Sequence, residues 1–417
     1  MSTYFLLNNI FGGIFFIFYV YQLYFIYVSL KRKPQPYPEA DPRRYAILIC
    51  ARNEIAVIGQ LLDSINAQEY PKDQVDVYVI ADNCTDDTAG VARGKGAIVV
   101  ERFDETKIGK GYALEYLLDH ISQNGTVWDY EGYFIIDSDN LLDKRFLAEM
   151  NKAVAAGNKI VTGYRNSKNY GDNWISSGYA LWFMRESKYL NNSREILGLS
   201  SQCSGTGFVI HRDIFMKYGG WKYFTLTEDV EFTFAMIAHG ERIAFCPAAI
   251  LYDEQPISFG VSWKQRTRWV KGYFQAYYRY GAKLLEGVFK RRAFSCYDML
   301  ANTFAGAIMS LSLFVFYFVT IACHAAAGLP LGEILFWFAS YVGSCYGGLI
   351  FIGSITTYTE WDLIFCPPAK KRAFVITFPL FLLTLLPITL CTPFSKQRWP
   401  QVTHVRAVDI EAVKQGK

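Results

Sequence analysis

Two short acidic clusters have the residue types and the spacing needed for transfer chemistry. Asp137 and Asp139 are separated by one residue and directly follow the apolar run 133–136. Two alternate carboxylates in a turn can reach one Mg²⁺ or Mn²⁺ ion, because these cations prefer oxygen ligands. A bound ion can compensate the negative charge of a departing diphosphate. The same pair could also be two solvated aspartates in a strand-to-loop turn.

The second cluster, Thr227-Glu228-Asp229, supplies a candidate general base. A carboxylate in a partly desolvated pocket can take the proton of a hydroxyl group, because burial raises its pKa. We assign this catalytic role to Asp229, with Glu228 as its neighbour. The structural alternative is that Thr227 caps a helix whose first turn carries acidic residues.

The run Gln265-Arg266-Thr267-Arg268-Trp269 is the most specific motif in the chain. The planar guanidinium of Arg268 can pair with the oxygens of a diphosphate. The indole of Trp269 offers an apolar face to a sugar ring and carries one N–H donor. The alternative is a helix at a membrane surface whose Arg and Trp side chains lie at headgroup level.

Three further polar residues follow apolar runs or lie in a glycine-rich loop. Asp82 follows the run 75–81 and can accept hydrogen bonds from a base or a ribose, and Glu54 follows the first strand in the same way; both could instead be turn or cap residues. Lys110, between Gly109 and Gly111, can reach a phosphate as a point charge or remain solvated. No G-x-x-x-x-G-K-[ST] sequence occurs, which excludes a Walker phosphate loop.

The elements that must position these residues alternate along the middle of the chain. A continuous apolar run, typical of a strand buried on both faces, occupies 45–50, and further strands are expected at 75–81, 97–101 and 133–136. Helical patterns occupy 55–65, 85–93, 110–121 and 227–239. This alternation predicts an α/β domain with a parallel sheet and crossover helices. Ligands bind beyond the carboxyl ends of such strands, where Asp82 and Asp137 lie.

Apolar stretches at both ends predict a membrane protein. The first, about 4–28, is followed by Lys31-Arg32-Lys33, which places the middle region in the cytoplasm. Further spans are expected at about 299–326, 334–356 and 374–392, although Pro379 and Pro387 leave room for a broken last segment. Four spans would put the C-terminal tail outside, against its charges Lys396, Arg398 and Arg406.

We therefore expect five regions. They are an N-terminal transmembrane helix (1–33), a cytoplasmic catalytic domain (34–260), amphipathic interface helices carrying the Gln265–Trp269 motif (261–292), C-terminal transmembrane helices (293–393) and a tail (394–417). The net charge of +4 is too weak to indicate nucleic acid, and no basic tract with interleaved aromatic residues occurs in the middle region. The nine cysteines are scattered without a C-x-x-C pair, which argues against structural zinc.

The motifs occur in the order D-x-D, then T-E-D, then Q-x-x-R-W, followed by apolar spans. In this order the chain resembles the membrane-embedded family 2 glycosyltransferases, the group that includes the cellulose, hyaluronan and chitin synthases. The resemblance covers residues 45–275 by motif and the two ends only by hydropathy. It implies an α/β GT-A fold (nucleotide-diphospho-sugar transferase) in the cytoplasm with a helical transmembrane region. It also implies a UDP-sugar donor, a Mg²⁺ or Mn²⁺ ion and inversion at the anomeric carbon.

By matching positions, the resemblance also implies roles. Asp82, with Glu54, Lys110 and Asp137, would bind the nucleotide sugar, and Asp137 with Asp139 would hold the metal. Asp229 would be the base, and Gln265, Arg268 and Trp269 would contact the diphosphate and the acceptor. One departure is Cys203-Ser204-Gly205-Thr206-Gly207, which replaces the Gly-Pro-type turn of chitin and hyaluronan synthases.

The expected function is an inverting, UDP-sugar-dependent hexosyltransferase that extends a polysaccharide at the plasma membrane, as a multi-pass protein with a cytoplasmic catalytic domain. Two alternatives remain open: a non-processive enzyme with a lipid acceptor, and a non-enzymatic export subunit. The expected partners are a UDP-sugar, a polysaccharide or lipid acceptor and the bilayer, with no nucleic acid. The sugar, the linkage and the oligomeric state stay open.

Overall fold

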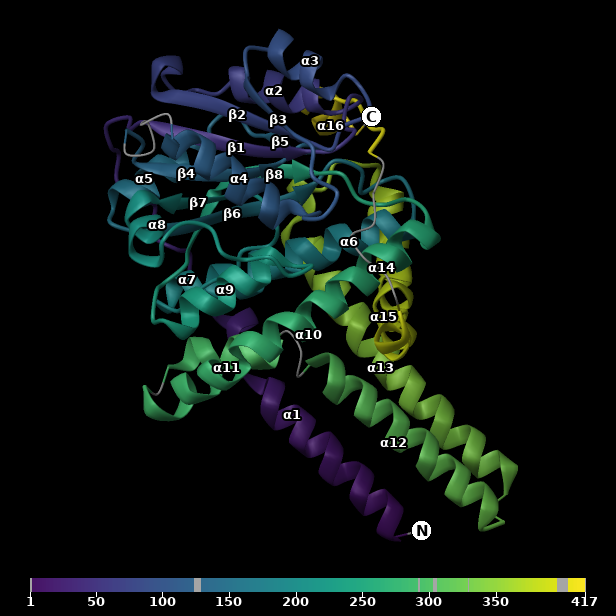
Figure 1. The fold of residues 1–417 in the computed structure, drawn as a ribbon. Helices are drawn as coiled ribbons and strands as arrows, with labels where there is room; N and C mark the ends of the chain where they lie inside the picture. Colours follow the sequence, from purple (N-terminus) through teal and green to yellow (C-terminus); the bar gives the residue numbers. More distant parts are fainter. Residues whose placement is uncertain are drawn as a thin grey trace.

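The computed structural model of the chain describes residues 2–123, 129–291, 293–302, 306–328, 330–395 and 404–416. A layered domain of strands and helices forms one end of the molecule, and long helices project from it (Figure 1). The N-terminus lies at the far end of one projecting helix, whereas the C-terminus lies on the layered domain.

Eight strands form one sheet in the order β3-β2-β1-β4-β7-β6-β8-β5. Their bounds are β1 Tyr45–Ala51, β2 Val75–Asp82, β3 Ile98–Arg102, β4 Gly132–Asp137, β5 Leu141–Leu142, β6 Ile160–Ser167, β7 Phe208–His211 and β8 Ala244–Asp253. The first four were predicted from their apolar runs, and β1 pairs parallel with both β2 and β4. The predicted parallel pairing is confirmed for these four strands, whereas β7 pairs antiparallel with β4 and β6, so the sheet as a whole is mixed.

Helices cover both faces of this sheet. Alternate β1 residues point to opposite faces: Ile47 and Ile49 pack with α2 and α5, while Ala46 and Leu48 pack with α4 and α9. The helices of the domain are α2 Ile58–Asn66, α3 Thr88–Gly94, α4 Lys110–Gln123, α5 Phe146–Ala155, α6 Trp174–Arg185, the π-helix η2 Glu186–Asn191, α7 Asn192–Ile196, α8 Arg212–Tyr218 and α9 Glu228–Ala238. Burial on both faces explains why the predicted strands contain almost no polar residues.

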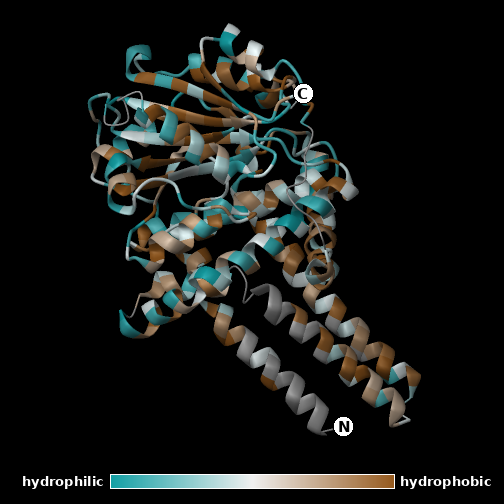
Figure 2. Cartoon of the chain, viewed as in Figure 1, coloured by the Kyte–Doolittle hydropathy of each residue, from teal (hydrophilic) through white to brown (hydrophobic). Residues whose placement is uncertain are grey.

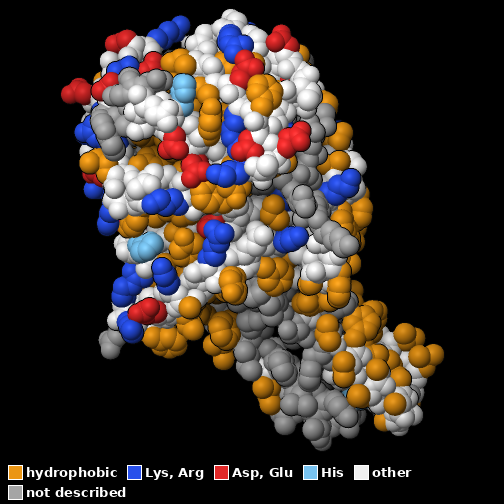
Figure 3. All heavy atoms as spheres, viewed as in Figure 1, with side chains coloured by type: hydrophobic (Ala, Val, Ile, Leu, Met, Phe, Trp, Pro, Cys, Tyr) orange, Lys and Arg blue, Asp and Glu red, His pale blue; other side chains and the backbone are white. Residues whose placement is uncertain are grey.

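The amphipathic region is a single 32-residue helix, α10 (Phe259–Lys290), followed by the short α11 (Phe294–Leu300). The projecting helices are α1 (Ser2–Lys31), α12 (Gly306–Ala326) and α13 (Leu331–Thr359). Figure 2 shows largely hydrophobic colours along α13. In Figure 3, apolar side chains cover the coloured part of the projecting helices, whereas charged side chains gather on the layered domain.

Among the described residues, two helical segments are long and apolar enough to cross a membrane, Leu331–Thr359 and Pro368–Phe394. The other two predicted spans, at about 4–28 and 299–326, remain predictions, because many of their side chains lie outside the described residues. The last span is broken as its prolines suggested: α14 (Pro368–Leu383) ends before α15 (Leu385–Cys391). Pro387 has no N–H to donate to the carbonyl four residues earlier, which interrupts the helix there.

The C-terminal tail returns to the catalytic domain. Its helix α16 (Ile410–Lys414) buries Val413 against Leu141 and Tyr252, and Lys414 pairs with Asp143 at 3.0 Å. A tail and a domain that touch must lie on the same side of a bilayer, which agrees with the charges of the tail and argues against the external placement that four spans would give. The last helices before the tail, α14 and α15, lie against α6 and α10 (Figure 1).

Candidate active site

One cavity of about 220 Å³ gathers almost all the predicted site residues. It opens beyond the carboxyl end of β4, where the sheet meets the first turn of α9 and the first half of α10. Nine of the ten predicted residues line it, namely Glu54, Lys110, Asp137, Asp139, Glu228, Asp229, Gln265, Arg268 and Trp269. The three motifs, far apart in the chain, therefore share one cleft, while the role of each residue stays a prediction.

Carboxylate oxygens of the D-x-D and T-E-D motifs both lie near Gly205. A Cβ at this glycine would lie 3.9 Å from Asp137 Oδ2, 3.9 Å from Asp229 Oδ2 and 3.8 Å from Arg165 Nη1. Gly205 also has φ +84, a backbone conformation that side chains larger than glycine strain to adopt. The turn 203–207 thus leaves space between the metal-binding candidate and the candidate base.

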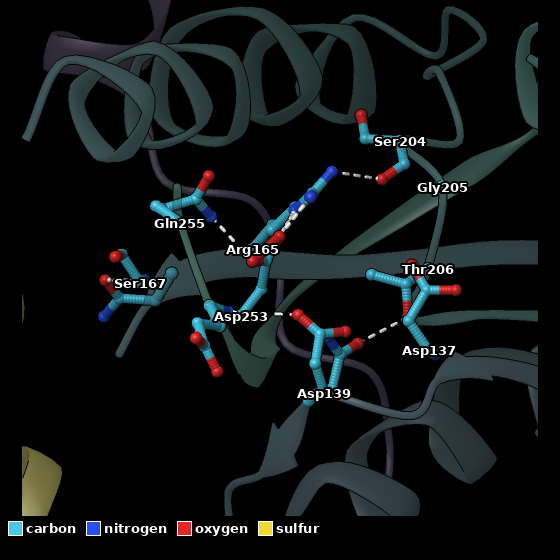
Figure 4. Close-up of polar contacts among 12 residues, drawn as sticks. Asp137, Asp139, Arg165, Ser167, Ser204, Gly205, Thr206, Asp253 and Gln255 are labelled. Atoms are coloured by element: carbon cyan, nitrogen blue, oxygen red, sulfur yellow. Dashed lines mark hydrogen bonds and ion pairs between the residues drawn. The ribbon is translucent and has the colours of Figure 1, made fainter. Parts of the chain in front are cut away.

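Backbone contacts fix the D-x-D turn at the end of β4. The Asp137 N–H donates to Thr206 Oγ1 at 2.9 Å, and Thr206 in turn donates to Asn140 at 2.5 Å. The side chain of Asp137 forms an ion pair with Lys110, whose Nζ also donates to the Gly205 carbonyl at 2.7 Å. Figure 4 shows Asp137 and Asp139 on the same side of the turn.

Lys110 therefore contacts carboxylates, where the sequence interpretation placed a phosphate. Its Nζ also lies 3.9 Å from Glu228 Oε1. Burial alone would lower the pKa of Lys110, but the charges of Asp137 and Glu228 outweigh this effect and raise it, so the amine stays cationic. A cation in this position can still face a diphosphate that enters the cleft between the two carboxylates.

The acidic pair opens α9 as predicted, but Thr227 makes no side-chain capping hydrogen bond. Instead Thr227 packs against α10, because a Cβ at Gly272 would lie only 2.4 Å from its Oγ1. Burial raises the pKa of Glu228 to about 7. Burial also raises the pKa of Asp229, and the nearby Lys110 opposes this rise. Both carboxyls thus have the raised pKa that a general base requires.

The residues of the Q-R-T-R-W motif separate into two groups. Arg268 and Trp269 line the cavity, with Arg268 Nη1 donating to the Leu226 carbonyl at 2.6 Å. Trp269 packs edge-on against Tyr179 and Phe183, with ring centroids 5.5 and 6.0 Å away. Arg266 points away and donates to the Phe381 carbonyl at 2.9 Å, which ties α10 to α14.

Asp82 is the exception among the predicted residues. It lies at the carboxyl end of β2, as expected, but its carboxylate pairs with Arg102 at 2.6 Å, and it is not among the residues that line the cavity. Both side chains are buried, so this ion pair links the carboxyl ends of the neighbouring strands β2 and β3. Its role in nucleotide binding stays a prediction.

Sequence reasoning missed several cavity residues, the first of which is Arg165. It forms an ion pair with the buried Asp253 and donates to the Ser204 carbonyl at 2.5 Å (Figure 4). Its guanidinium lies 3.7 Å from the centroid of the Phe183 ring. Burial raises the pKa of Asp253 to about 6 in spite of this arginine. No local motif marks either residue, since β6 and β8 bring them together from separate parts of the chain.

The tail supplies a second missed residue, His404. Its Nδ1 lies 3.0 Å from both carboxylate oxygens of Glu54, and its Nε2 lies 3.7 Å from Asp139 Oδ2. The backbone N–H groups of Val405 and Arg406 donate to Glu254 at 3.1 and 3.2 Å. Burial alone would lower the pKa of His404, but Asp139 and Glu54 raise it to about 10. The tail thus places a cation beside the D-x-D turn.

The D-x-D turn offers oxygen ligands of the kind that a divalent metal ion prefers. Asp137 and Asp139 present carboxylate oxygens to the same cavity, which suits Mg²⁺ or Mn²⁺. In the part of the chain that the structure describes, no three His, Cys, Asp or Glu residues are already grouped as a metal site. Lys110 contacts Asp137 and His404 faces Asp139, so the donors fit a metal but currently face side-chain cations.

Comparison with known proteins agrees with this geometry. The probable glycosyltransferase YdaM of Bacillus subtilis is 28% identical over 300 residues, which cover 65% of this chain and 66% of YdaM. A beta-monoglucosyldiacylglycerol synthase of Nostoc sp. is 28% identical over 269 residues, covering 61% of this chain and 54% of that protein. A poly-beta-1,6-N-acetyl-D-glucosamine synthase of Staphylococcus aureus is 23% identical, covering 65% and 62%. The chain therefore spans less than two thirds of each relative.

The fold also matches a solved structure, the mannosyltransferase PcManGT from Pyrobaculum calidifontis in complex with GDP-Man and Mn²⁺. The TM-score is 0.58 at 16% identity, covering 92% of this chain and 99% of that one, which shows a shared GT-A-like α/β fold. Residues 42–272, more than half of the chain, match the family model described as "Glycosyltransferase like family 2". The chain thus belongs to the family 2 glycosyltransferases.

Proposed function

We propose that this glycosyltransferase moves a sugar from a UDP-sugar to a hydroxyl group of an acceptor at a membrane, with inversion at the anomeric carbon. The convergence at Gly205 carries the proposal. Carboxylates from the ends of β4 and the start of α9, and the guanidinium of Arg165, all lie within 4 Å of one Cβ position beside an open cavity. A single displacement needs such an arrangement, with charge compensation on one side and a base on the other.

In the proposed step, the acceptor oxygen bonds to the anomeric carbon as the bond from that carbon to the diphosphate oxygen breaks. The electron pair leaves on the diphosphate, and the hydroxyl proton passes to Asp229. Lys110 and Arg268 face the departing charge from the wall of the cavity. Attack from the side opposite to the leaving group inverts the configuration. Glu228, with a pKa of about 7, is buried beside the base.

Asp137 and Asp139 are the residues that would hold Mg²⁺ or Mn²⁺. The ion would compensate the charge of the diphosphate in the donor and in the released UDP. Glu54 lies at the same end of the cavity, where its carboxylate contacts His404. We assign Glu54 and Asp82 to the nucleotide end of the site.

For the acceptor, the first candidate is a growing polysaccharide. Trp182, Phe183, Trp269 and Tyr273 line one side of the cavity, and aromatic faces suit the apolar faces of sugar rings. The similarity to a poly-beta-1,6-N-acetyl-D-glucosamine synthase supports this candidate. Synthesis at the cytoplasmic face of the plasma membrane would follow from the apolar helices Leu331–Thr359 and Pro368–Phe394.

The second candidate is a lipid acceptor. The aromatic wall continues directly into the apolar helix α14, because Phe381 packs against Tyr179 next to Trp269. A lipid hydroxyl could therefore reach the cleft from the membrane side. The similarity to beta-monoglucosyldiacylglycerol synthases favours this route, although these alignments cover about half of each relative.

One experiment tests the activity and separates the acceptors. Purified full-length protein is incubated with Mn²⁺ and a panel of radiolabelled UDP-sugars, and released UDP and product size are measured. Metal-dependent UDP release is expected for at least one donor. A ladder of lengths would identify a polysaccharide, and one added sugar would identify a lipid or another single acceptor. The absence of UDP release with every donor would contradict the proposal and favour an export subunit.

A further inference from the structure

The cavity contains a carboxylate that the proposed displacement does not use. Glu186 lines the cavity, although only 8% of its surface is exposed. It is the first residue of the π-helix η2, which continues α6. π-helical turns inside longer helices are frequently found at functional sites. The Ser204 hydroxyl donates to Glu186 Oε1 at 2.9 Å, which fixes the carboxylate against the turn that carries Gly205.

Glutamine side chains on the same cavity carry oxygens that lack donors. Gln202 is 5% exposed and lines the cavity, yet its Oε1 accepts no hydrogen bond from any residue that the structure describes. The Oε1 of Gln265, also a lining residue, accepts none within the described ranges either. A buried acceptor left without a donor is unfavourable, because it has lost its hydrogen bonds to water. A ligand that brings O–H donors would remove this deficit.

Positive charges surround the buried carboxyl of Glu186. Burial raises the pKa of this carboxyl, and the nearby guanidinium groups of Arg194, Arg165 and Arg185 oppose the rise. Glu186 and the candidate base Asp229 also line the same cavity. A hydroxyl group bound by Glu186 would therefore be near the group that deprotonates the acceptor.

We propose that Glu186, Gln202 and Gln265 form a subsite that binds a sugar ring of the acceptor through several of its hydroxyl groups. The proposal rests on the function proposed above and adds the chemical class of the acceptor. Glu186 and the Oε1 atoms of both glutamines act as acceptors towards the ligand, so the wall matches a molecule with several donors. Diacylglycerol has one hydroxyl group, whereas a glycan or a glycolipid presents several on one ring. Trp182, Trp269 and Tyr273 line the same cavity and offer aromatic faces to the apolar side of a sugar ring.

Direct binding tests the subsite without turnover. Cellotriose, chitotriose and dioleoylglycerol in phosphatidylcholine vesicles are titrated into the full-length protein, with UDP and Mn²⁺ present, and binding is followed by calorimetry. At least one trisaccharide is expected to bind, and Glu186→Gln and Gln202→Leu are expected to weaken it at least tenfold. Glu286→Gln, a change at an exposed glutamate of α10, is the matched control and should bind as the wild type does.

Kinetics then separate this subsite from the general proposal. With a donor that is turned over, Glu186→Gln should raise the KM for the trisaccharide at least tenfold with less than a threefold change in kcat, and Glu186→Asp should recover part of the loss. UDP affinity should not change. Binding of dioleoylglycerol alone, or unchanged trisaccharide affinity in a folded Glu186→Gln variant, would overturn the subsite. Failure of UDP release with trisaccharide binding intact would instead refute the proposed transfer.

Discussion

The imidazole of His404 lies 3.0 Å from the carboxylate of Glu54, although 350 residues separate them in the chain. The contact brings a segment from beyond the apolar helices into the catalytic cleft, where it also faces Asp139 at 3.7 Å. Two carboxylates at this end of the cavity thus share one side-chain cation. This contact has consequences for metal binding and for the topology of the chain.

The first prediction concerns His404→Ala. Removing the imidazolium takes away the cation that contacts Glu54 and faces Asp139, and a divalent ion at the D-x-D turn would then compensate more charge. Mn²⁺ should therefore raise the Tm of the variant more than that of the wild-type protein. Differential scanning calorimetry with and without Mn²⁺ measures this difference. A smaller shift in the variant would mean that His404 helps to hold the metal rather than replacing it.

The second prediction concerns the topology. Because α16 packs on the catalytic domain, the C-terminus and that domain should lie on the same side of the membrane, with the turn at Gly328 on the opposite side. Epitope tags at Gly328 and after Lys417 can be probed by protease protection in membrane vesicles. Protection of both tags together, or exposure of both together, would contradict this arrangement.

The third prediction concerns the Arg165–Asp253 ion pair. Arg165→Met leaves Asp253, whose side chain is 3% exposed, buried without its partner. Breaking a buried pair in this way typically costs about 3–5 kcal/mol. Chemical denaturation should show this loss, and adding Asp253→Asn should recover part of it. Arg93→Ala, at an exposed pair with Glu101, should change stability by less than about 1 kcal/mol.

The fourth prediction concerns pH. Burial raises the pKa of Glu228 from 4.5 to about 7, so the folded state holds this proton over a range in which the unfolded state has lost it. Glu228 therefore makes the free energy of unfolding fall as the pH rises from about 4.5 to 7, by up to about 3 kcal/mol. Glu228→Gln should flatten this part of the profile and should be relatively more stable at pH 8. Parallel profiles for the two proteins would refute the assignment.

The sequence predicted the elements with strong local signals. The runs that became β1 and β4 are continuously apolar, because helices cover both faces of the sheet. Asp137 and Asp229 were predicted to share a cleft from the order of their motifs, and both line one cavity. The strand β6 was missed because Gly163, Arg165 and Asn166 interrupt its apolar pattern.

The features that the sequence did not predict depend on contacts between residues far apart in the chain. The antiparallel direction of β7 is set by its pairing with β4 and β6, which no local pattern encodes. Arg165 and Glu186 lie outside any motif, and only the fold brings them beside Asp229. Asp82 follows a strand just as Asp137 does, but Arg102 on the neighbouring strand pairs with it. The return of His404 to the domain depends on how the helices before it pack.

The central claim is that Asp229 deprotonates the acceptor in the cleft at Gly205. Asp229→Asn keeps the shape of the side chain but removes the base, so UDP-sugar turnover should fall by at least about 10²–10³-fold. The affinity for UDP, measured by calorimetry with Mn²⁺, should stay the same. Asp63→Asn, a change at an exposed residue, should behave as the wild type does. Turnover by Asp229→Asn at the wild-type rate would contradict the account.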